Sequence, residues 1–207
     1  MPGLFTRVLK SRVTEVCDQR KDHLMEASTG AAAHIERHDV QGNLVGFNKD
    51  HQRFVFLQFP DAANGREFLA SIQPDLASAT EMLLFNQLHK EIHVRRGGAT
   101  QIVESTWTNL ALTFTGLQAL GADGLDTFPE EFKQGMAARA QEIGDLDDSA
   151  PGGWVAPFGQ QIHAMAIVAA DTIEDLESGD GRLAAKCQAH DITELGHLDG
   201  VDRKSVV

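Results

Sequence analysis

The stretch RFVFLQF, from Arg53 to Phe59, carries apolar side chains on both faces of an alternating pattern. Phe54 and Phe56 fall on one face, whereas valine, leucine and phenylalanine fall on the other. Apolar residues on both faces of a short run are typical of a strand that is buried inside a sheet. This segment therefore predicts a buried strand, and the elements around it are interpreted from there.

A helix is predicted directly after this strand. Asp61 is a suitable N-cap, and Phe68, Leu69 and Ile72 recur at helical spacing behind it. The sequence thus continues from a strand into a helix.

A second strand is predicted within WTNLALTFTGLQALG, residues 107–121. Leu110, Leu112 and Phe114 alternate with smaller or more polar residues, which suits a strand with one buried face. Thr115 is the predicted N-cap of the short helix that follows.

The best helical pattern is FPEEFKQGMAARAQEIGD, residues 128–145. Pro129 suits the first turn, the two glutamates after it complement the helix dipole, and Gly144 suits the stop. One apolar stripe is predicted along this helix, formed by Phe132, Met136, Ala140 and Ile143.

The last patterned segments are HAMAIVAAD, residues 163–171, and DTIEDLESGDGRLAAK, residues 171–186. The first is small and apolar on both sides, which predicts a central strand. The second is predicted to be helical at its start and looser around Gly179 and Gly181.

This order of elements predicts an α+β fold, a ferredoxin-like antiparallel sheet with helices on one face. The second strand of such a unit is expected between Ala77 and Val103, where the pattern is fragmentary. The first 33 residues are weakly patterned and are predicted to form an arm that precedes the domain of residues 34–201.

The charge balance bears on the partners. Thirty acidic residues against 18 basic ones give a formal net charge of -12, which repels phosphate backbones and anionic lipids. Nucleic acid and membrane surfaces are therefore not expected partners.

The cysteines and the start of the chain bear on disulfides and location. Cys17 and Cys187 stand far apart, which argues against a disulfide scaffold. No secretory signal is recognisable at the start, so a cytoplasmic location is favoured.

The histidines offer one pattern that metal sites use. His89 and His93 stand four residues apart, and on a helix they would share one face. No third ligand stands at a suitable spacing, so we expect surface histidines rather than a metal site.

The segment GHLDG, Gly196 to Gly200, has two interpretations. Asp-Gly is a common turn dipeptide, and a plain turn is one of them. The other is a binding site, because glycines without a Cβ let the backbone lie close to a flat ligand and present Asp199 to it.

Six segments in order resemble the dye-decolorising (DyP-type) heme peroxidases and favour the second interpretation. The last of them, GHLDG, stands where that family carries a G-x-x-D-G motif. His197 departs from the aromatic residue that the family has there. The six segments are residues 39–59, 107–121, 128–145, 149–159, 163–171 and 196–200.

The resemblance implies a peroxidase of two ferredoxin-like halves that binds heme b. Asp199 would be the distal acid–base residue that takes a proton from hydrogen peroxide and returns it, with Gly196 and Gly200 against the cofactor. The partners implied are hydrogen peroxide and an organic reducing substrate such as a dye or a phenol. A homo-oligomer is compatible with this family.

The same resemblance implies that the axial histidine and a distal arginine belong to a carboxy-terminal half that is missing here. The last six residues, DRKSVV, depart from the family pattern and resemble the translation of a sequencing adapter, so residues 202–207 are predicted to be a non-native tail. The fragment alone is expected to be inactive. The alternative is a non-catalytic ferredoxin-like module that binds a small molecule or dimerises.

Overall fold

The computed structural model describes residues 35–95 and 104–202. The predicted arm of residues 1–33, Cys17 and residues 203–207 lie outside this part of the chain. The helices and strands follow the order β1 (His51–Gln58), α2 (Ala62–Ile72), α3 (Ala79–Arg95), β2 (Thr106–Leu112), α4 (Phe114–Ala119), α5 (Glu130–Ala138), α6 (Ala140–Ile143), β3 (Ala164–Ala170), α7 (Ile173–Ala189) and β4 (Thr193–Val201).

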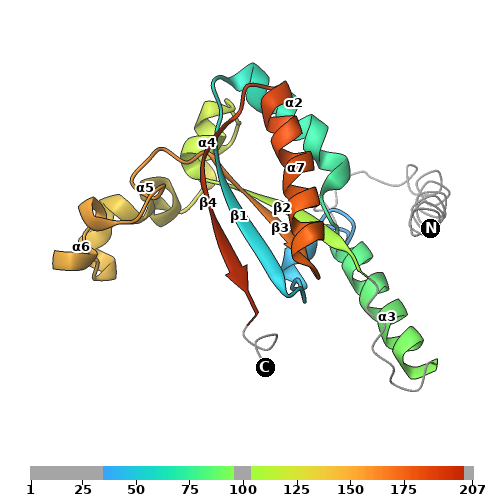
Figure 1. Ribbon diagram of the computed structural model, residues 1–207. Helices are drawn as coiled ribbons and strands as arrows, with labels where there is room; N and C mark the ends of the chain where they lie inside the picture. Colours follow the sequence, from blue (N-terminus) through green and yellow to red (C-terminus); the bar gives the residue numbers. More distant parts are fainter. Residues whose placement is uncertain (1–34, 96–103, 203–207) are drawn as a thin grey trace. The chain divides into compact units, whose positions relative to one another are not determined.

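The strands form an antiparallel sheet in the order β2-β3-β1-β4. Helices α2 and α7 lie together on one face of this sheet (Figure 1). The predicted ferredoxin-like α+β fold is therefore confirmed. The predicted buried strand is β1, and the predicted central strand is β3, which lies between β2 and β1.

The core lies between the sheet and these two helices. Val55 and Leu57 of β1 are buried there, as predicted for this face of the strand. They pack with Phe68 and Ile72 of α2, whose N-cap is Asp61, as predicted, and the cap accepts from the Asn64 N–H at 2.9 Å. Further core residues come from β3 and α7, namely Ala164, Ala166, Val168, Leu176, Leu183 and Cys187.

The second strand was expected between Ala77 and Val103, but residues 96–103 lie outside the described part of the chain, and Ala79–Arg95 forms helix α3. Ser78 and Glu81 form a capping box at its start. The Ser78 Oγ accepts from the Glu81 N–H at 3.2 Å, and the Glu81 carboxylate accepts from the Ser78 N–H at 2.8 Å. This reciprocal cap, followed by good helix-forming residues, favours a helix over a strand. The second strand of the fold is instead β2.

The predicted cap at Thr115 was displaced by two residues. The hydroxyl of Thr113 accepts from the Gly116 N–H at 3.0 Å, so α4 begins at Phe114 and the strand before it ends at Leu112. Phe114 therefore does not continue the strand alternation. Instead it packs edge-on against Phe132 with ring centroids 6.0 Å apart.

The predicted helix of residues 128–145 is broken, and its single apolar stripe is not formed. Gly135 has φ 72° and ψ 177°, a conformation that is open to glycine but not to other residues, and Arg139 separates α5 from α6. Met136 remains 65% exposed as a result.

The predicted loosening around Gly179 and Gly181 was wrong as well, because α7 is continuous from Ile173 to Ala189. Gly179 is needed for close packing. A Cβ there would lie 2.8 Å from a methyl carbon of Thr106 and 2.8 Å from one of Val168. The glycine thus lets α7 approach β2 and β3 closely.

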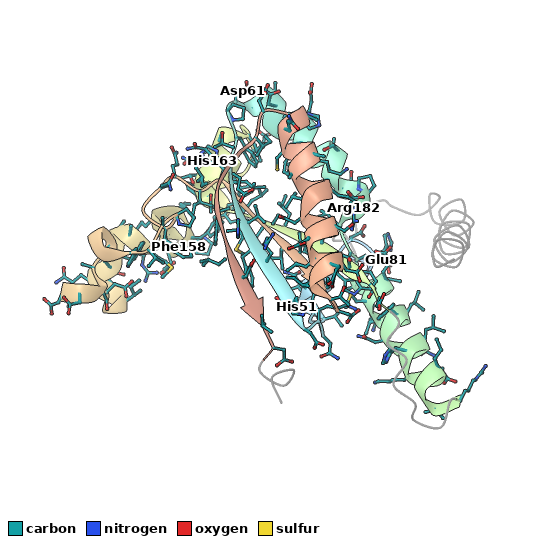
Figure 2. The ribbon with its side chains drawn as sticks, viewed as in Figure 1. His51, Asp61, Glu81, Phe158, His163 and Arg182 are labelled. Atoms are coloured by element: carbon teal, nitrogen blue, oxygen red, sulfur yellow. The ribbon has the colours of Figure 1, made fainter. Side chains whose placement is uncertain are left out.

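A buried imidazole makes the stability of the fold depend on pH. The Nδ1 atom of His163 accepts from the Phe59 N–H at 3.0 Å, and its Nε2 has no hydrogen-bond partner in the described part of the chain. His163 is labelled in Figure 2 at the same end of the sheet as Asp61. Burial lowers the pKa of His163. Protonation would place a proton on Nδ1, which could then no longer accept the hydrogen bond from the Phe59 N–H.

We expect the free energy of unfolding to fall as the pH drops. Because the pKa of His163 is lower in the folded state than in the unfolded chain, the unfolded chain binds more protons below about pH 6.5. The contribution of His163 is complete above that pH and is lost as the pH falls toward the folded-state pKa. Urea unfolding at several pH values measures it, and His163→Gln should flatten this part of the profile. His197→Gln is the matched control at an exposed position; an unchanged slope in His163→Gln would contradict the account.

Candidate active site on the edge strand

The motif Gly196–Gly200 lies on β4, an edge strand, and does not form a turn. Within the described residues β4 pairs with β1 alone, so its other edge is free. The pairing is irregular between Phe56 and Leu57, next to Gly196, whose φ of 150° favours glycine. The plain-turn interpretation of the motif is therefore wrong.

The three predicted site residues do not share one face of the strand. Asp199 lies opposite Arg53 in the register and projects toward the helix-covered face. Gly196 and Gly200 lie opposite Phe56 and Gln52, whose side chains project from the other face. A flat ligand can therefore meet the glycines and the carboxylate together only along the free edge of β4.

Asp199 is held by a two-pronged ion pair. The Nε and Nη2 atoms of Arg53 donate to its two carboxylate oxygens at 2.7 and 2.8 Å. The Nη1 atom of Arg53 donates to Asp180 of α7 at 2.8 Å. The Arg53 side chain is 14% exposed, against 45% for Asp199, so the carboxylate keeps access to solvent while the guanidinium is mostly covered.

This ion pair sets the protonation of both groups. The hydrogen bonds from Arg53 lower the pKa of Asp199; its partial burial opposes this effect, and the charges of Arg53 and His197 add to it. The pKa of Arg53 is raised by its hydrogen bonds to Asp199 and Asp180. The Asp199 carboxylate is therefore ionised even in mildly acidic solution.

Arg53 and Asp180 were not predicted as part of the site. One signal was present, because Arg53 shares a face of β1 with Val55 and Leu57, and a charge on a buried face requires a partner. Asp180 carried no such signal, since the segment around it was interpreted as a loosened end of a helix.

Two further histidines from the sequence analysis, His197 and His89, lie at the surface or on a helix and contact neighbouring side chains. His197 has its Nδ1 atom 2.9 Å from a carboxylate oxygen of Glu194 and is 46% exposed. His89 lies on α3 and stacks on Phe85 with ring centroids 6.4 Å apart. Across the described ranges no group of three His, Cys, Asp or Glu side chains could hold a metal ion.

The domain described as the DyP dimeric alpha+beta barrel domain matches residues 39–204 of this chain. The match covers most of the chain and includes every strand of the sheet.

The chain belongs to the dye-decolorizing peroxidase family.

It corresponds to the amino-terminal domain of these DyP proteins. The chain is 31% identical over 179 residues to the dye-decolorizing peroxidase msp1 of Mycetinis scorodonius, a match that covers 86% of the chain and 31% of that protein. It is 33% identical over 201 residues to the dye-decolorizing peroxidase AauDyP1 of Auricularia auricula-judae, covering 87% of the chain and 35% of that protein.

A solved structure shows the same fold. A mutant of the dye-decolorizing peroxidase from Pleurotus ostreatus superposes with a TM-score of 0.72 at 22% identity, covering 82% of this chain and 36% of that one. The chain thus spans about a third of the length of the relatives it matches.

Among the described residues, the Asp199 carboxylate is exposed at the free edge of β4, where it can exchange protons with a ligand bound beside the strand. A groove of about 350 Å³ lies beside α2, but its lining residues include no histidine or cysteine that could serve as an axial ligand.

None of the described helices combines the length and apolar content that a bilayer span requires.

Proposed function

We propose that this chain forms the distal half of a heme peroxidase that uses hydrogen peroxide to oxidise an organic donor such as a dye or a phenol. The observation that carries the proposal is the ionised and solvent-accessible Asp199, fixed by Arg53 on the edge strand of a DyP domain. The similar proteins from Mycetinis scorodonius and Auricularia auricula-judae are dye-decolorizing peroxidases, which supports a peroxidase activity.

A bound heme b would supply the redox chemistry of the reaction with peroxide. Asp199 would accept a proton from one oxygen of hydrogen peroxide at a lone pair that Arg53 leaves free and return it to the other oxygen, which would leave as water when the O–O bond breaks, the heme supplying the two electrons for that cleavage. Because its pKa is lowered, the carboxylate stays competent as a base in mild acid. Gly196 and Gly200 add no side chain on either side of Leu198, so the cofactor can approach the backbone of β4 closely at these two positions along the free edge of the strand.

The sheet face away from α2 and α7 exposes apolar side chains that a second, carboxy-terminal half of the protein would cover. Leu198 and Phe158 are each 40% exposed on this side, and Phe158 packs edge-on against Phe56 with ring centroids 5.1 Å apart. Figure 2 shows Phe158 on the opposite side of the sheet from Arg182 of α7. A further ferredoxin-like half that carries the axial histidine would cover this apolar face.

These exposed apolar side chains also favour the second candidate function, a non-catalytic module that pairs with a copy of itself. A module of that kind would bury the same face in a symmetric dimer without heme. The two candidates differ in whether a longer protein containing this domain binds heme.

We expect the 207-residue chain alone to form no tight stoichiometric complex with heme, because an iron porphyrin needs an axial ligand from the protein. Titration of the chain with heme, followed by the Soret band, measures this. A protein of the relatives' full length that contains this domain should bind one heme under the same conditions. A stoichiometric Soret complex of the chain alone, with peroxide-dependent dye oxidation, would contradict the proposal.

A further inference from the structure

Arg53 is an unusual residue for its position. It lies on the face of β1 that also carries Val55 and Leu57, and its side chain is only 14% exposed. A guanidinium that gives up most of its hydration requires good hydrogen-bond geometry in return. Its Nε, Nη1 and Nη2 atoms all donate to carboxylates, which meets that requirement.

We propose that Arg53, anchored by Asp180, is a positioning residue that fixes the direction of the Asp199 carboxylate at the free edge of the sheet. The inference rests on the proposed role of Asp199 in proton transfer. It adds two residues to the site that act through Asp199 and do not contact the peroxide.

The two parallel hydrogen bonds define what Asp199 can do. Because Nε and Nη2 each donate to a different oxygen, the plane of the carboxylate is aligned with the plane of the guanidinium. One lone pair of each oxygen is used in this way. The lone pairs that remain free point away from Arg53, and the side chain that carries them is 45% exposed.

Asp180 completes the arrangement from the helix. A guanidinium with a single carboxylate partner can pivot about that partner, whereas a second carboxylate on Nη1 fixes the orientation of the plane. Asp180 reaches Arg53 because Gly179, the residue before it, lets α7 pack closely on Thr106 and Val168. The segment SGDG of α7 thus connects helix packing to the orientation of Asp199.

The charges around Asp199 come from three elements. Arg53 on β1 and His197 on β4 favour the ionised carboxylate, and Asp180 on α7 carries a like charge that Arg53 shares. Arg53 contributes most of the effect through its hydrogen bonds. Its removal should therefore raise the pKa of Asp199, whatever the other two groups do.

The test is carbon-detected NMR titration of the Asp199 carboxyl group in the 207-residue chain. Arg53→Gln should move the titration midpoint upward, and Arg53→Lys should move it less, because lysine keeps the charge but cannot form the fork. Asp180→Asn should lower the heteronuclear NOE of the Arg53 Nε–Hε group, since the anchor of the guanidinium is weakened. A purely structural role of Arg53 would change the unfolding midpoint and leave the Asp199 titration unchanged.

Arg182→Gln is the matched control, an arginine on α7 whose Nη1 donates to Ser178 at 3.0 Å. It should leave the Asp199 midpoint and the Arg53 NOE as in the wild type. Amide spectra establish folding of each variant, and Arg53→Lys carries the test if Arg53→Gln does not fold. An Asp199 midpoint that is the same in wild type and in the folded Arg53 variants overturns the inference.

Failure of this inference and failure of the proposed function are distinguishable. The NMR test needs no heme, so an unchanged midpoint overturns the role of Arg53 whatever Asp199 does in turnover. In a heme-loaded protein of full length, Arg53→Lys should lower kcat/KM for peroxide roughly tenfold, because the acceptor is misoriented. A turnover that is insensitive to Asp199 itself would instead overturn the proposed function and leave the geometry standing.

Discussion

In a heme-loaded protein of the relatives' full length that contains this domain, Asp199→Asn should lower peroxide-dependent turnover by about 10²- to 10⁴-fold, the usual contribution of a positioned acid–base group. The amide keeps the size and shape of the carboxylate but cannot accept the proton of peroxide at neutral or mildly acidic pH. Initial rates of dye oxidation against peroxide concentration measure the effect. The Soret band should remain, because Asp199 is not proposed to bind iron.

Glu194→Gln is the matched control for this variant. Glu194 is another carboxylate of β4, it is 40% exposed, and its partner is His197 rather than Arg53. Its replacement should leave turnover within about twofold, as expected for a surface substitution outside the site. Equal losses in the two variants would mean that negative charge on the strand, and not proton transfer at Asp199, supports the reaction.

The largest effect on stability is expected from Gly116→Ala. An alanine Cβ at this position would lie 1.9 Å from the carbonyl oxygen of His163 and 2.7 Å from its carbonyl carbon. Both are backbone atoms, so neither can move aside as a flexible side chain would. The N–H of Gly116 also donates to the hydroxyl of its N-cap, Thr113, and this hydrogen bond restricts any shift of α4 that would relieve the clash. We expect a loss of about 3 kcal/mol or more in the free energy of unfolding, measured by urea denaturation.

Gly181→Ala is the control for the intrinsic effect of alanine in a helix. Gly181 also lies within a helix, α7, but no neighbouring atom would come within 4 Å of its added Cβ. This variant should gain about 0.5–1 kcal/mol from the better helix propensity of alanine. A Gly116→Ala protein as stable as the wild type would show that α4 and His163 do not pack as described.

The strands were predictable where burial is written into the local pattern. Arg53–Phe59 is apolar on both faces, and residues 163–171 are small and apolar throughout, which leaves few alternatives to a buried strand. The N-cap at Asp61 was equally local, since the side chain binds a backbone N–H three residues away.

The errors arose mainly where a glycine plays a role that periodicity does not show. Gly179 was interpreted as a weak point in a helix, but it is the contact through which α7 approaches β2 and β3. The break in the pattern of residues 128–145 depends on Gly135, whose left-handed conformation no periodicity reveals. The capping box of Ser78 and Glu81, in contrast, is a local signal that was overlooked.

The candidate site likewise contains one residue that a local motif predicts and one that only the folded structure reveals. Asp199 was found because its motif is contiguous and resembles that of a family. Arg53 lies 146 residues before it, and their contact depends on the pairing of the first and last strands of the sheet. Sequence spacing alone carries no information about such a pair, so the two-pronged ion pair required a structure.

The most direct test of the account is the structure of a heme-loaded protein of full length that contains this domain. We predict that the free oxygen lone pairs of Asp199 face the peroxide-binding side of the heme, within about 2.6–3.2 Å of a ligand bound there or through one water molecule. The pair with Arg53 should be retained. A heme placed on the sheet face of Leu198 and Phe158, with Asp199 directed away from it, would contradict the account.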